Sequence, residues 1–323
     1  MTRKCTTLQT INLYGYYALM SLRRKFLISS IHGGLGDQLY KYYAALYFSE
    51  IQKRELILDI KSDVEVKFNG LVNLIPPIAD YFEKIPKSAL MRKTLFTKII
   101  GTLAGKNYPF SIEAKRILYF IFGVLDDTDL NYELVKTEQV LKKFHRMRFH
   151  KYIFSIGYFQ DFAYYDLLPH VKRQLPGLKP VSEYSNLKYA CVHFRNGDIF
   201  HTYTSRGVLD DAYYDGAALV YMDKVELVVG VSDDVKTCKE IHKIRNVSMI
   251  DDSDQYDAEL ILRLMSFAQV RVCANSGLSL WASKLSPLEQ SITIIPAKMD
   301  KTLSYNPIRS IPKDWLTIEN GFI

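Results

Sequence analysis

The sequence has few of the features that mark a secreted, membrane-spanning or metal-binding protein. No apolar run reaches the roughly 18 residues that a membrane-spanning helix requires. The 4 cysteines form no C-x-x-C pair, which favours reduced thiols in a cytosolic protein over disulfides. The 7 histidines are dispersed without the spacing of metal ligands. Charged residues make up 24% and hydrophobic residues 48% of the chain, which indicates a folded globular protein.

Two nucleotide-binding signatures are also incomplete. The turn at 32–38 follows an apolar segment and contains three glycines, Gly33, Gly34 and Gly36. Glycines let backbone amides approach a ligand, and the following helix directs its positive end to the same turn. Asp59 lies about 20 residues further on, as in a dinucleotide-binding unit. However, Leu39 replaces the third glycine and no G-x-x-x-x-G-K-[ST] loop is present, which disfavours a nucleotide-dependent oxidoreductase.

Most of the positive charge lies in one segment. The chain has a formal net charge of +7, and residues 84–116 hold eight basic residues against one acidic residue, Glu113. Apolar residues recur through the segment at mostly helical spacing. Such a segment is predicted either to lie on an anionic membrane surface or to form a solvated helix with an ordinary buried face. No nucleic-acid-binding motif accompanies the charge, so nucleic acid is not an expected partner.

The order of apolar segments predicts the fold class. A strand–helix–strand unit is expected at 25–60, and residues 61–154 read as helical and irregular. After residue 180, strands at 189–194, 226–231, 247–250, 270–274 and 292–295 alternate with helical patterns such as 257–268. This alternation predicts parallel sheets. We therefore expect an α/β protein with two Rossmann-like domains facing a central cleft. The expected parts are a poorly ordered leader at 1–24, a domain at 25–175, a linker at 176–180 and a domain at 181–323.

Polar residues follow several of the expected strands. They are His193, Arg195, Asp198, Ser232, Asp233, Asp234, Asp251, Asp252, Asn275 and Ser276. Because the carboxyl ends of parallel strands share one edge, these residues are expected to gather there. Arginine keeps its charge at any working pH, and its planar fork suits a diphosphate, which makes Arg195 a candidate ligand contact. The alternatives are helix caps for the serines and aspartates, a salt bridge from Arg195 to Asp198, and a core histidine at 193.

Several stretches, in order, resemble glycosyltransferase family 11. HGGLGDQLYKY at 32–42 resembles the family's opening G-G-[LM]-G-N-Q-[ML]-F-Q-Y, and GYFQ at 157–160 resembles its G-Y-[FW]-Q segment. HFRNGD at 193–198 resembles H-x-R-R-G-D, and the S-D-D at 232–234 is present. Residues 260–285 resemble L-x-L-M-S-x-C…A-N-S-[ST]-[FL]-S-W-W, with the tryptophan pair reduced to Leu280-Trp281. The family comprises α-1,2-fucosyltransferases that use GDP-fucose.

The resemblance implies a GT-B fold and inverting transfer of L-fucose, without a metal or other cofactor, to a glycan hydroxyl such as the 2-OH of a galactoside. Arg195 would bind the donor diphosphate, the domain at 25–175 would face the acceptor, and 181–323 would bind the nucleotide sugar. The expected nucleotide-sugar contacts are Arg195, Gly33, Gly34, Gly36, Ser232, Asp233, Asn275 and Ser276. The D-x-D pattern at 252–254 precedes a helix and is read as a cap, so no metal site is predicted.

The catalytic base is left open among Asp37, His193 and Asp198. The family's second arginine is Asn196 here, and its first-motif asparagine is Asp37, so one cation is lost and one carboxylate is gained. The alternatives are therefore a transferase of the same fold that uses another nucleotide sugar, and a non-catalytic carbohydrate-binding or membrane-docking homologue. We expect a cytoplasmic protein. If its acceptor is lipid-linked, the segment 84–116 would hold it on the inner membrane face.

Overall fold

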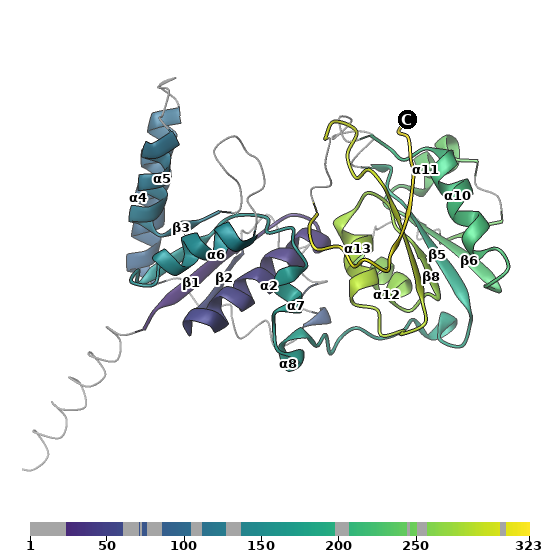
Figure 1. Ribbon diagram of the computed structural model, residues 1–323, viewed down its shortest axis with the longest axis horizontal. Coiled ribbons are helices and arrows are strands. Elements are labelled where there is room, and N and C mark those ends of the chain that lie inside the picture. The colour runs from purple at the N-terminus through teal and green to yellow at the C-terminus, as the bar shows by residue number, and fades with distance from the viewer. Residues whose placement is uncertain are drawn as a thin grey trace, which may run out of the picture. The chain divides into compact units, whose positions relative to one another are not determined.

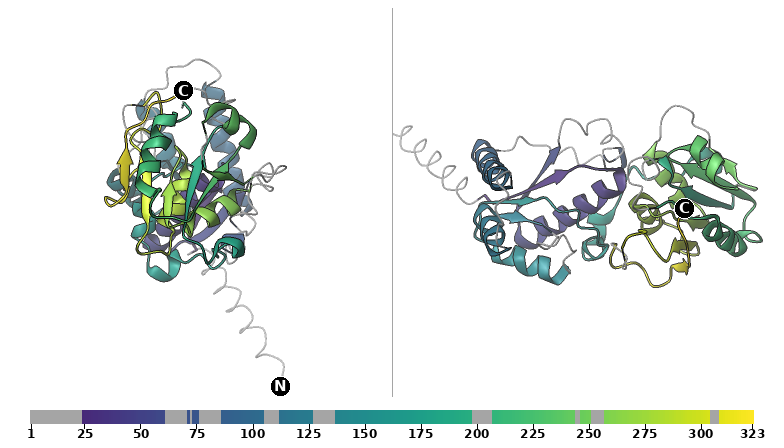
Figure 2. Two further views of the ribbon diagram at one scale, coloured as in Figure 1. Left: turned by 90° about the vertical axis from the view of Figure 1, so that its right-hand side faces the viewer. Right: turned by 90° about the horizontal axis from the view of Figure 1, so that it is seen from above.

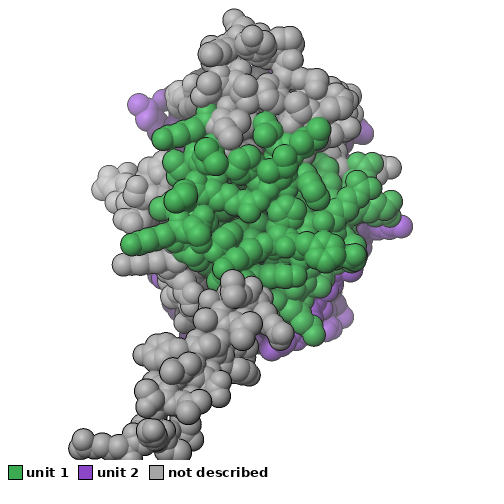
Figure 3. Space-filling view, turned by 90° about the vertical axis from the view of Figure 1, so that its left-hand side faces the viewer, with its two compact units in different colours: residues 1–30, 42–59, 80–157 green, residues 31–41, 60–79, 158–323 purple. Residues whose placement is uncertain are grey.

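The computed structural model describes residues 24–60, 71, 73–75, 86–104, 112–126, 137–197, 207–243, 246–250, 257–303 and 308–323 (Figure 1). Contacts divide the chain into two compact units. Unit 1 comprises 1–30, 42–59 and 80–157, and unit 2 comprises 31–41, 60–79 and 158–323. Figure 3 shows the surface of unit 1 in green. Of the expected leader at 1–24, only Arg24 lies within the described residues.

Unit 1 is built around a four-stranded sheet in the order β2-β1-β4-β3. The strands are β1 (Phe26–Ile31), β2 (Glu55–Ile60), β3 (Val124–Leu125) and β4 (Tyr152–Ser155). The helices are α4 (Lys87–Ala104), α5 (Ile112–Phe122), α6 (Thr137–Arg146) and α2 (Leu35–Gln52), whose first residues, up to Lys41, belong to unit 2. β4 pairs in parallel with both β1 and β3. Ala89 of α4 and Phe122 of α5 are buried in one cluster with Phe26 and Ile28 of β1. Seen from above, α2 and α6 lie on the other side of the strands (Figure 2).

The expectation that residues 61–154 contain only helical and irregular structure was wrong, because β3 and most of β4 fall within that range. β3 follows α5 after a single residue, Gly123, and all residues of both strands are buried. A parallel strand covered on both faces is a continuous apolar run without alternation. Such a short run beside a helix has no period of its own to reveal it.

Unit 2 contains a six-stranded parallel sheet in the order β10-β9-β8-β5-β6-β7. Its strands are β5 (Tyr189–Phe194), β6 (Leu227–Ser232), β7 (Ser248–Met249), β8 (Val270–Val272), β9 (Ile292–Pro296) and β10 (Leu316–Ile318). Its helices are α7 (Ala163–Asp166), α8 (His170–Arg173), η3 (Ser182–Tyr184), α10 (Asp211–Tyr221), α11 (Val235–Ile241), α12 (Ala258–Ser266) and α13 (Gly277–Lys284). From β5 the chain adds β6 and β7 on one side, then crosses to β8 on the other side.

Alternation along β5 decides which helices its side chains meet. Ala190, Val192 and Phe194 share a buried cluster with residues of α10 and α11. Tyr189 faces the opposite way, and its Oη donates a hydrogen bond to the Leu264 carbonyl of α12 at 2.7 Å. Because side chains alternate along a strand, His193 lies on the face of Tyr189.

The predicted α/β class with two parallel sheets is confirmed. All five strands expected after residue 180 are present, with bounds shifted by at most two residues at either end, and β10 is an additional strand. The three described cysteines, Cys191, Cys238 and Cys273, are free and buried. Within the described ranges, no helix is both long and apolar enough to cross a membrane. The domain bounds 25–175 and 181–323 stay a prediction. The contact-based unit 2 begins its last segment at residue 158 and also includes the turn at 32–38.

Candidate active site

The strand order of unit 2 creates a switch point between β5 and β8. The chain leaves the carboxyl ends of these neighbouring parallel strands toward opposite sides of the sheet, which opens a crevice where α/β sheets bind ligands. Arg195 follows β5 directly, and its Nη1 donates to the backbone carbonyl of Asn275, beyond β8, at 3.1 Å. This contact places a half-buried guanidinium at the switch point. Arg195, which was predicted to bind a diphosphate, is thus brought together with Asn275, the polar residue predicted at the end of the neighbouring strand.

Asp233 holds the turn that carries Arg195. Its Oδ1 accepts hydrogen bonds from the backbone amides of Asn196 at 2.8 Å and Gly197 at 3.0 Å. The next residue, Asp234, caps α11, with its Oδ1 accepting from the Thr237 amide at 2.9 Å. The S-D-D stretch therefore supplies a helix cap, as the sequence also allowed, and a tie between β6 and the end of β5.

Asn196, which stands where the family has its second arginine, points into the protein. It is completely buried. Its Oδ1 lies 3.3 Å from His242 Nε2, and His242 Nδ1 lies 2.8 Å from Asp211 Oδ1. Asn196 lies two residues beyond the end of β5 and on the same side as Phe194, whose ring also packs against His242, so its side chain joins a buried polar chain on the face of the sheet that meets α10 and α11. The His242–Asp211 pair was not predicted, and no local pattern in the sequence links residues so far apart.

Asn275 and Ser276 lie between β8 and α13. Ser276 caps α13 through a hydrogen bond from the Leu278 amide to its Oγ at 3.3 Å. Asn275 is 5% exposed, and its Nδ2 donates to the Gly207 carbonyl at 3.0 Å. Its Oδ1 has no hydrogen-bond partner in the described part of the chain. A buried amide oxygen without a partner costs free energy, so this atom is suited to receive a donor group from a ligand.

The three glycines of the turn at 32–38 have different reasons to be glycine. Gly33 has a φ of +93°, which favours glycine. A Cβ on Gly36 would lie 2.5 Å from the Leu278 nitrogen, so Gly36 permits close packing on the start of α13. A Cβ on Gly34 would meet no heavy atom within 4 Å, and Gly34 is exposed. Of the three glycines, only Gly34 is therefore required neither by a positive φ nor by close packing, and its exposed surface is open to a ligand.

The turn at 32–38 is fixed beside α13 by aromatic packing. Tyr40 of α2 lies 4.9 Å from Trp281 of α13 between ring centroids, and Phe162 lies 4.9 Å from the same indole. Trp281 is 1% exposed. The tryptophan that remains of the family's pair therefore packs in the interior of unit 2, against the first turns of α2.

Asp37 lies in the first turn of α2, where the positive end of the helix favours a carboxylate. Its Oδ1 accepts a hydrogen bond from Gln160 Nε2 at 3.2 Å. The main chain of Gln160 is held in turn, because its carbonyl accepts from the Arg309 amide at 3.0 Å. Gln160 is therefore a further candidate site residue, which the sequence shows only as part of the GYFQ motif. Lys41, one helical turn after Asp37, is fully buried and donates to the His32 carbonyl at 3.2 Å.

The other two candidate bases stay predictions. His193 is completely buried, in keeping with the core histidine that the sequence also allowed. Asp198 lies outside the described residues, as do Asp251 and Asp252. Of the three candidate bases, the described structure therefore places Asp37 alone at a half-exposed position.

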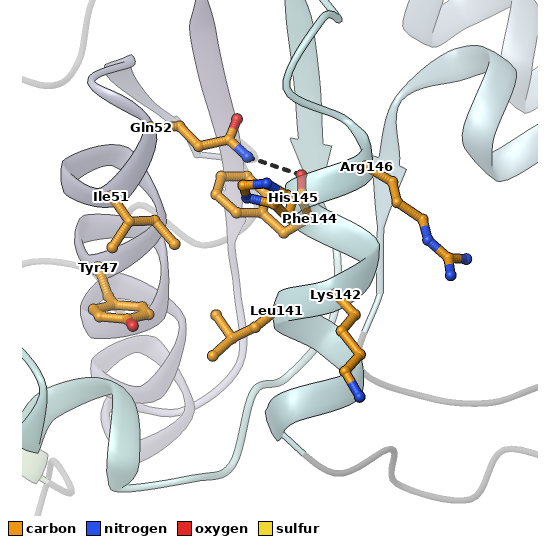
Figure 4. Close-up of a pocket in the computed structure, with 8 residues that line it drawn as sticks. All are labelled: Tyr47, Ile51, Gln52, Leu141, Lys142, Phe144, His145 and Arg146. Carbon is orange, nitrogen blue, oxygen red and sulfur yellow. Dashed lines mark hydrogen bonds between the residues drawn. The ribbon is translucent and has the colours of Figure 1, made fainter.

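A separate groove of about 470 Å³ lies in unit 1 between α2 and α6 (Figure 4). Its lining comprises Tyr47, Ile51, Gln52, Leu141, Lys142, Phe144, His145 and Arg146. Gln52 Nε2 donates to the Phe144 carbonyl at 2.8 Å and joins the two helices. No predicted site residue lines this groove, so it is distinct from the residues gathered at the switch point.

Comparisons with known proteins agree with the motifs. A family model described as Glycosyl transferase family 11 matches residues 30–319. The O-antigen biosynthesis glycosyltransferase WbnK of Escherichia coli is 26% identical over 311 residues, which cover 84% of this chain and 94% of WbnK.

The solved structures that the chain matches have low TM-scores and low sequence identity. A glycosyl transferase family 9 protein from Veillonella parvula gives a TM-score of 0.42 at 9% identity, covering 91% of this chain and 86% of that one. The E. coli heptosyltransferase WaaC gives 0.38 at 12% identity, covering 91% and 92%.

Proposed function

Because the chain belongs to glycosyl transferase family 11, it is a glycosyltransferase, and we propose that it transfers L-fucose with inversion from GDP-fucose to a glycan hydroxyl. The observation that carries the proposal is the guanidinium of Arg195 at the switch point of the parallel sheet, 3.1 Å from the Asn275 carbonyl. The donor sugar rests on the resemblance of the motifs to α-1,2-fucosyltransferases.

In the proposed reaction the acceptor oxygen attacks the anomeric carbon of fucose while the bond to the β-phosphate of GDP breaks. Negative charge develops on the departing diphosphate. The guanidinium of Arg195 stabilises this negative charge through its planar fork, which is the role that a metal ion has in other transferases. Loss of one such preorganised donor lowers the rate by about 10²–10³-fold.

We assign to Asp37 the role of the general base that removes the proton from the acceptor hydroxyl. The hydrogen bond from Gln160 holds its Oδ1 in place, which leaves Oδ2 for the acceptor hydroxyl. Gly34 lies exposed in the same turn, three residues before Asp37, and its open surface would admit the acceptor or the sugar. In this scheme Gln160 is a positioning residue, because it acts through Asp37.

The acceptor is proposed to be a glycan of a surface polysaccharide, with a galactoside 2-OH as the receiving group. This rests on the name of the E. coli relative, an O-antigen biosynthesis glycosyltransferase. If the acceptor is lipid-linked, the enzyme would act at the cytoplasmic face of a membrane.

The test is a donor screen on the purified parent and on two arginine variants. Thermal-shift measurements with GDP-fucose, GDP-mannose and UDP-sugars identify the donor, and linkage analysis of the product identifies the hydroxyl. Arg195→Ala is expected to abolish detectable transfer and Arg195→Lys to restore part of it, since lysine lacks the bidentate fork. Arg263→Ala is the matched control, because Arg263 is a half-buried arginine of the same unit that also donates to backbone carbonyls.

Near-normal turnover in Arg195→Ala would overturn the assignment. Asn196 carries no charge and points away from the switch point, so Arg195 is the only arginine that the described part of the HFRNGD motif brings to that edge. If another nucleotide sugar raised the melting temperature and GDP-fucose did not, the protein would still be a glycosyltransferase, but its donor would be that other nucleotide sugar.

A further inference from the structure

The helices α4 and α5 of unit 1 expose a large amount of apolar surface. Leu90, Met91 and Leu95 of α4 are 50%, 72% and 51% exposed. On α5 the exposed residues are Ile117 at 57%, Phe120 at 48% and Ile121 at 51%. Single exposed apolar side chains are ordinary, whereas a face of them on a helix marks an interaction surface.

The exposed residues of α4 form one face. Leu90, Met91 and Leu95 line a shallow hollow of about 410 Å³ together with Thr94, and Lys87 and Lys98 lie at its two ends in the sequence. The spacing of these residues repeats every three to four positions, as on one side of a helix. Ala89 lies on the other side of α4, fully buried in the core of unit 1. The face therefore points away from the sheet.

The charge on α4 has one sign. The helix contains four basic residues and no acidic residue. Lys93 pairs with Asp59, and Arg92 donates to the Ile121 carbonyl of α5. Lys87 and Lys98 are exposed and form no ion pair among the described residues. Two cations thus flank the apolar face and are available to an external anion.

We propose that this face of α4 docks the protein on an anionic lipid surface. Met91 and its apolar neighbours would enter the boundary between headgroups and acyl chains, and the flanking lysines would meet lipid phosphates. A second copy of the chain is a poorer occupant, because it would bring four like charges of each α4 together. The inference goes beyond the transfer reaction and holds for any donor sugar.

The test is co-sedimentation of the full chain with vesicles of phosphatidylcholine, alone or mixed with phosphatidylglycerol. Binding is expected only to the anionic vesicles and is expected to fall with added salt. The variant Lys87→Gln/Lys98→Gln should lower the partition coefficient by roughly 30-fold, since each basic residue near an anionic surface contributes a factor of roughly five. Its matched control is Lys142→Gln/Arg146→Gln, which removes the same charge from α6 on the other side of the sheet.

A second pair tests the apolar part of the face. Met91→Glu/Leu95→Glu should abolish vesicle binding. Leu219→Glu/Met222→Glu makes the same change at side chains that are 83% and 60% exposed in unit 2, and should leave binding intact. Both pairs change exposed positions, so an unchanged circular dichroism spectrum confirms that the variants fold.

Three results would overturn the proposal. Equal losses of vesicle binding in a variant and in its matched control would show that net charge, and not this face of α4, drives binding. Equal binding to pure phosphatidylcholine would remove the need for anionic lipid. A dimer of the parent that Met91→Glu/Leu95→Glu dissociates would assign the face to self-association. Transfer to a soluble acceptor, measured without vesicles, should be normal in the α4 variants, so a failure of the docking surface is distinguishable from a failure of the transferase assignment.

Discussion

Replacing Gly36 and Gly34 by alanine separates a glycine that the fold needs from one that it does not need. An added Cβ at Gly36 would lie 2.5 Å from the Leu278 nitrogen and 2.6 Å from the Gly277 carbonyl carbon. Both atoms are backbone at the start of α13 and cannot rotate away. At Gly34 the same methyl group would meet no heavy atom within 4 Å.

The magnitudes follow from these contacts. Overpacking costs about 1–3 kcal/mol, and the cost at Gly36 lies at the upper end because two backbone segments must separate. Alanine is a better helix former than glycine by about 1 kcal/mol, which offsets part of that cost in the first turn of α2. At Gly34, where φ is not positive, alanine restricts the unfolded chain and so stabilises by about 0.4–1 kcal/mol, but Gly34 is also the N-cap of α2, where alanine is less favourable than glycine by a similar amount, so the substitution is close to neutral. We expect Gly36→Ala to be less stable than Gly34→Ala by about 2 kcal/mol.

Urea unfolding monitored by tryptophan fluorescence measures the difference. Both tryptophans, Trp281 and Trp315, lie in unit 2 together with the turn at 32–38, so the signal reports the unit that the substitutions affect. With a urea dependence of about 2 kcal/mol per molar, the two midpoints should differ by about 1 M. Gly34→Ala should also raise the KM if a ligand covers that position.

Equal midpoints for the two variants would refute the packing argument, because the turn would then not rest on α13. Parental kinetics in Gly34→Ala would remove Gly34 from the ligand contacts and leave the packing argument intact.

Three further predictions concern single side chains. Asp37→Asn should lower kcat across the pH range while Gln160→Ala shifts its pH profile, and unchanged profiles in both would exclude Asp37 as the base. Asn196→Arg should destabilise the protein by several kcal/mol in urea unfolding without tightening donor binding, since the new cation would be buried beside His242; a stable variant with tighter binding would contradict the inward orientation. Burial raises the pKa of the Cys273 thiol from its ordinary 9.0 to about 11, so its contribution to stability is complete below pH 9 and is lost as the pH rises through 11. At pH 10 the loss should be about 1.4 kcal/mol, and replacement of Cys273 by serine should reduce the pH dependence of the free energy of unfolding by that amount.

Local pattern was sufficient where a strand forms an apolar run of about six residues or a helix shows its period. β2 and β5 occur at the residues expected from the sequence, and the helical pattern at 257–268 contains α12. β3 and β4 could not be recognised in this way, because they are only two and four residues long, and such short buried strands show neither alternation nor a distinct apolar run. The pairing of β4 with β1, and of β3 with β4, supplies the hydrogen bonds that the short runs cannot supply for themselves.

The sequence by itself determined the α/β class, the family, and the position of Arg195 directly after a strand, because these depend on local spacing and on residue type. Only the tertiary structure decided what each polar residue meets. The order of strands in the sheet brought Asn275 to Arg195, and the alternation of β5 turned Asn196 toward His242. The packing of the turn at 32–38 on α13 separated Gly36 from Gly34. These outcomes arise from contacts between segments far apart in the chain, which no local pattern encodes.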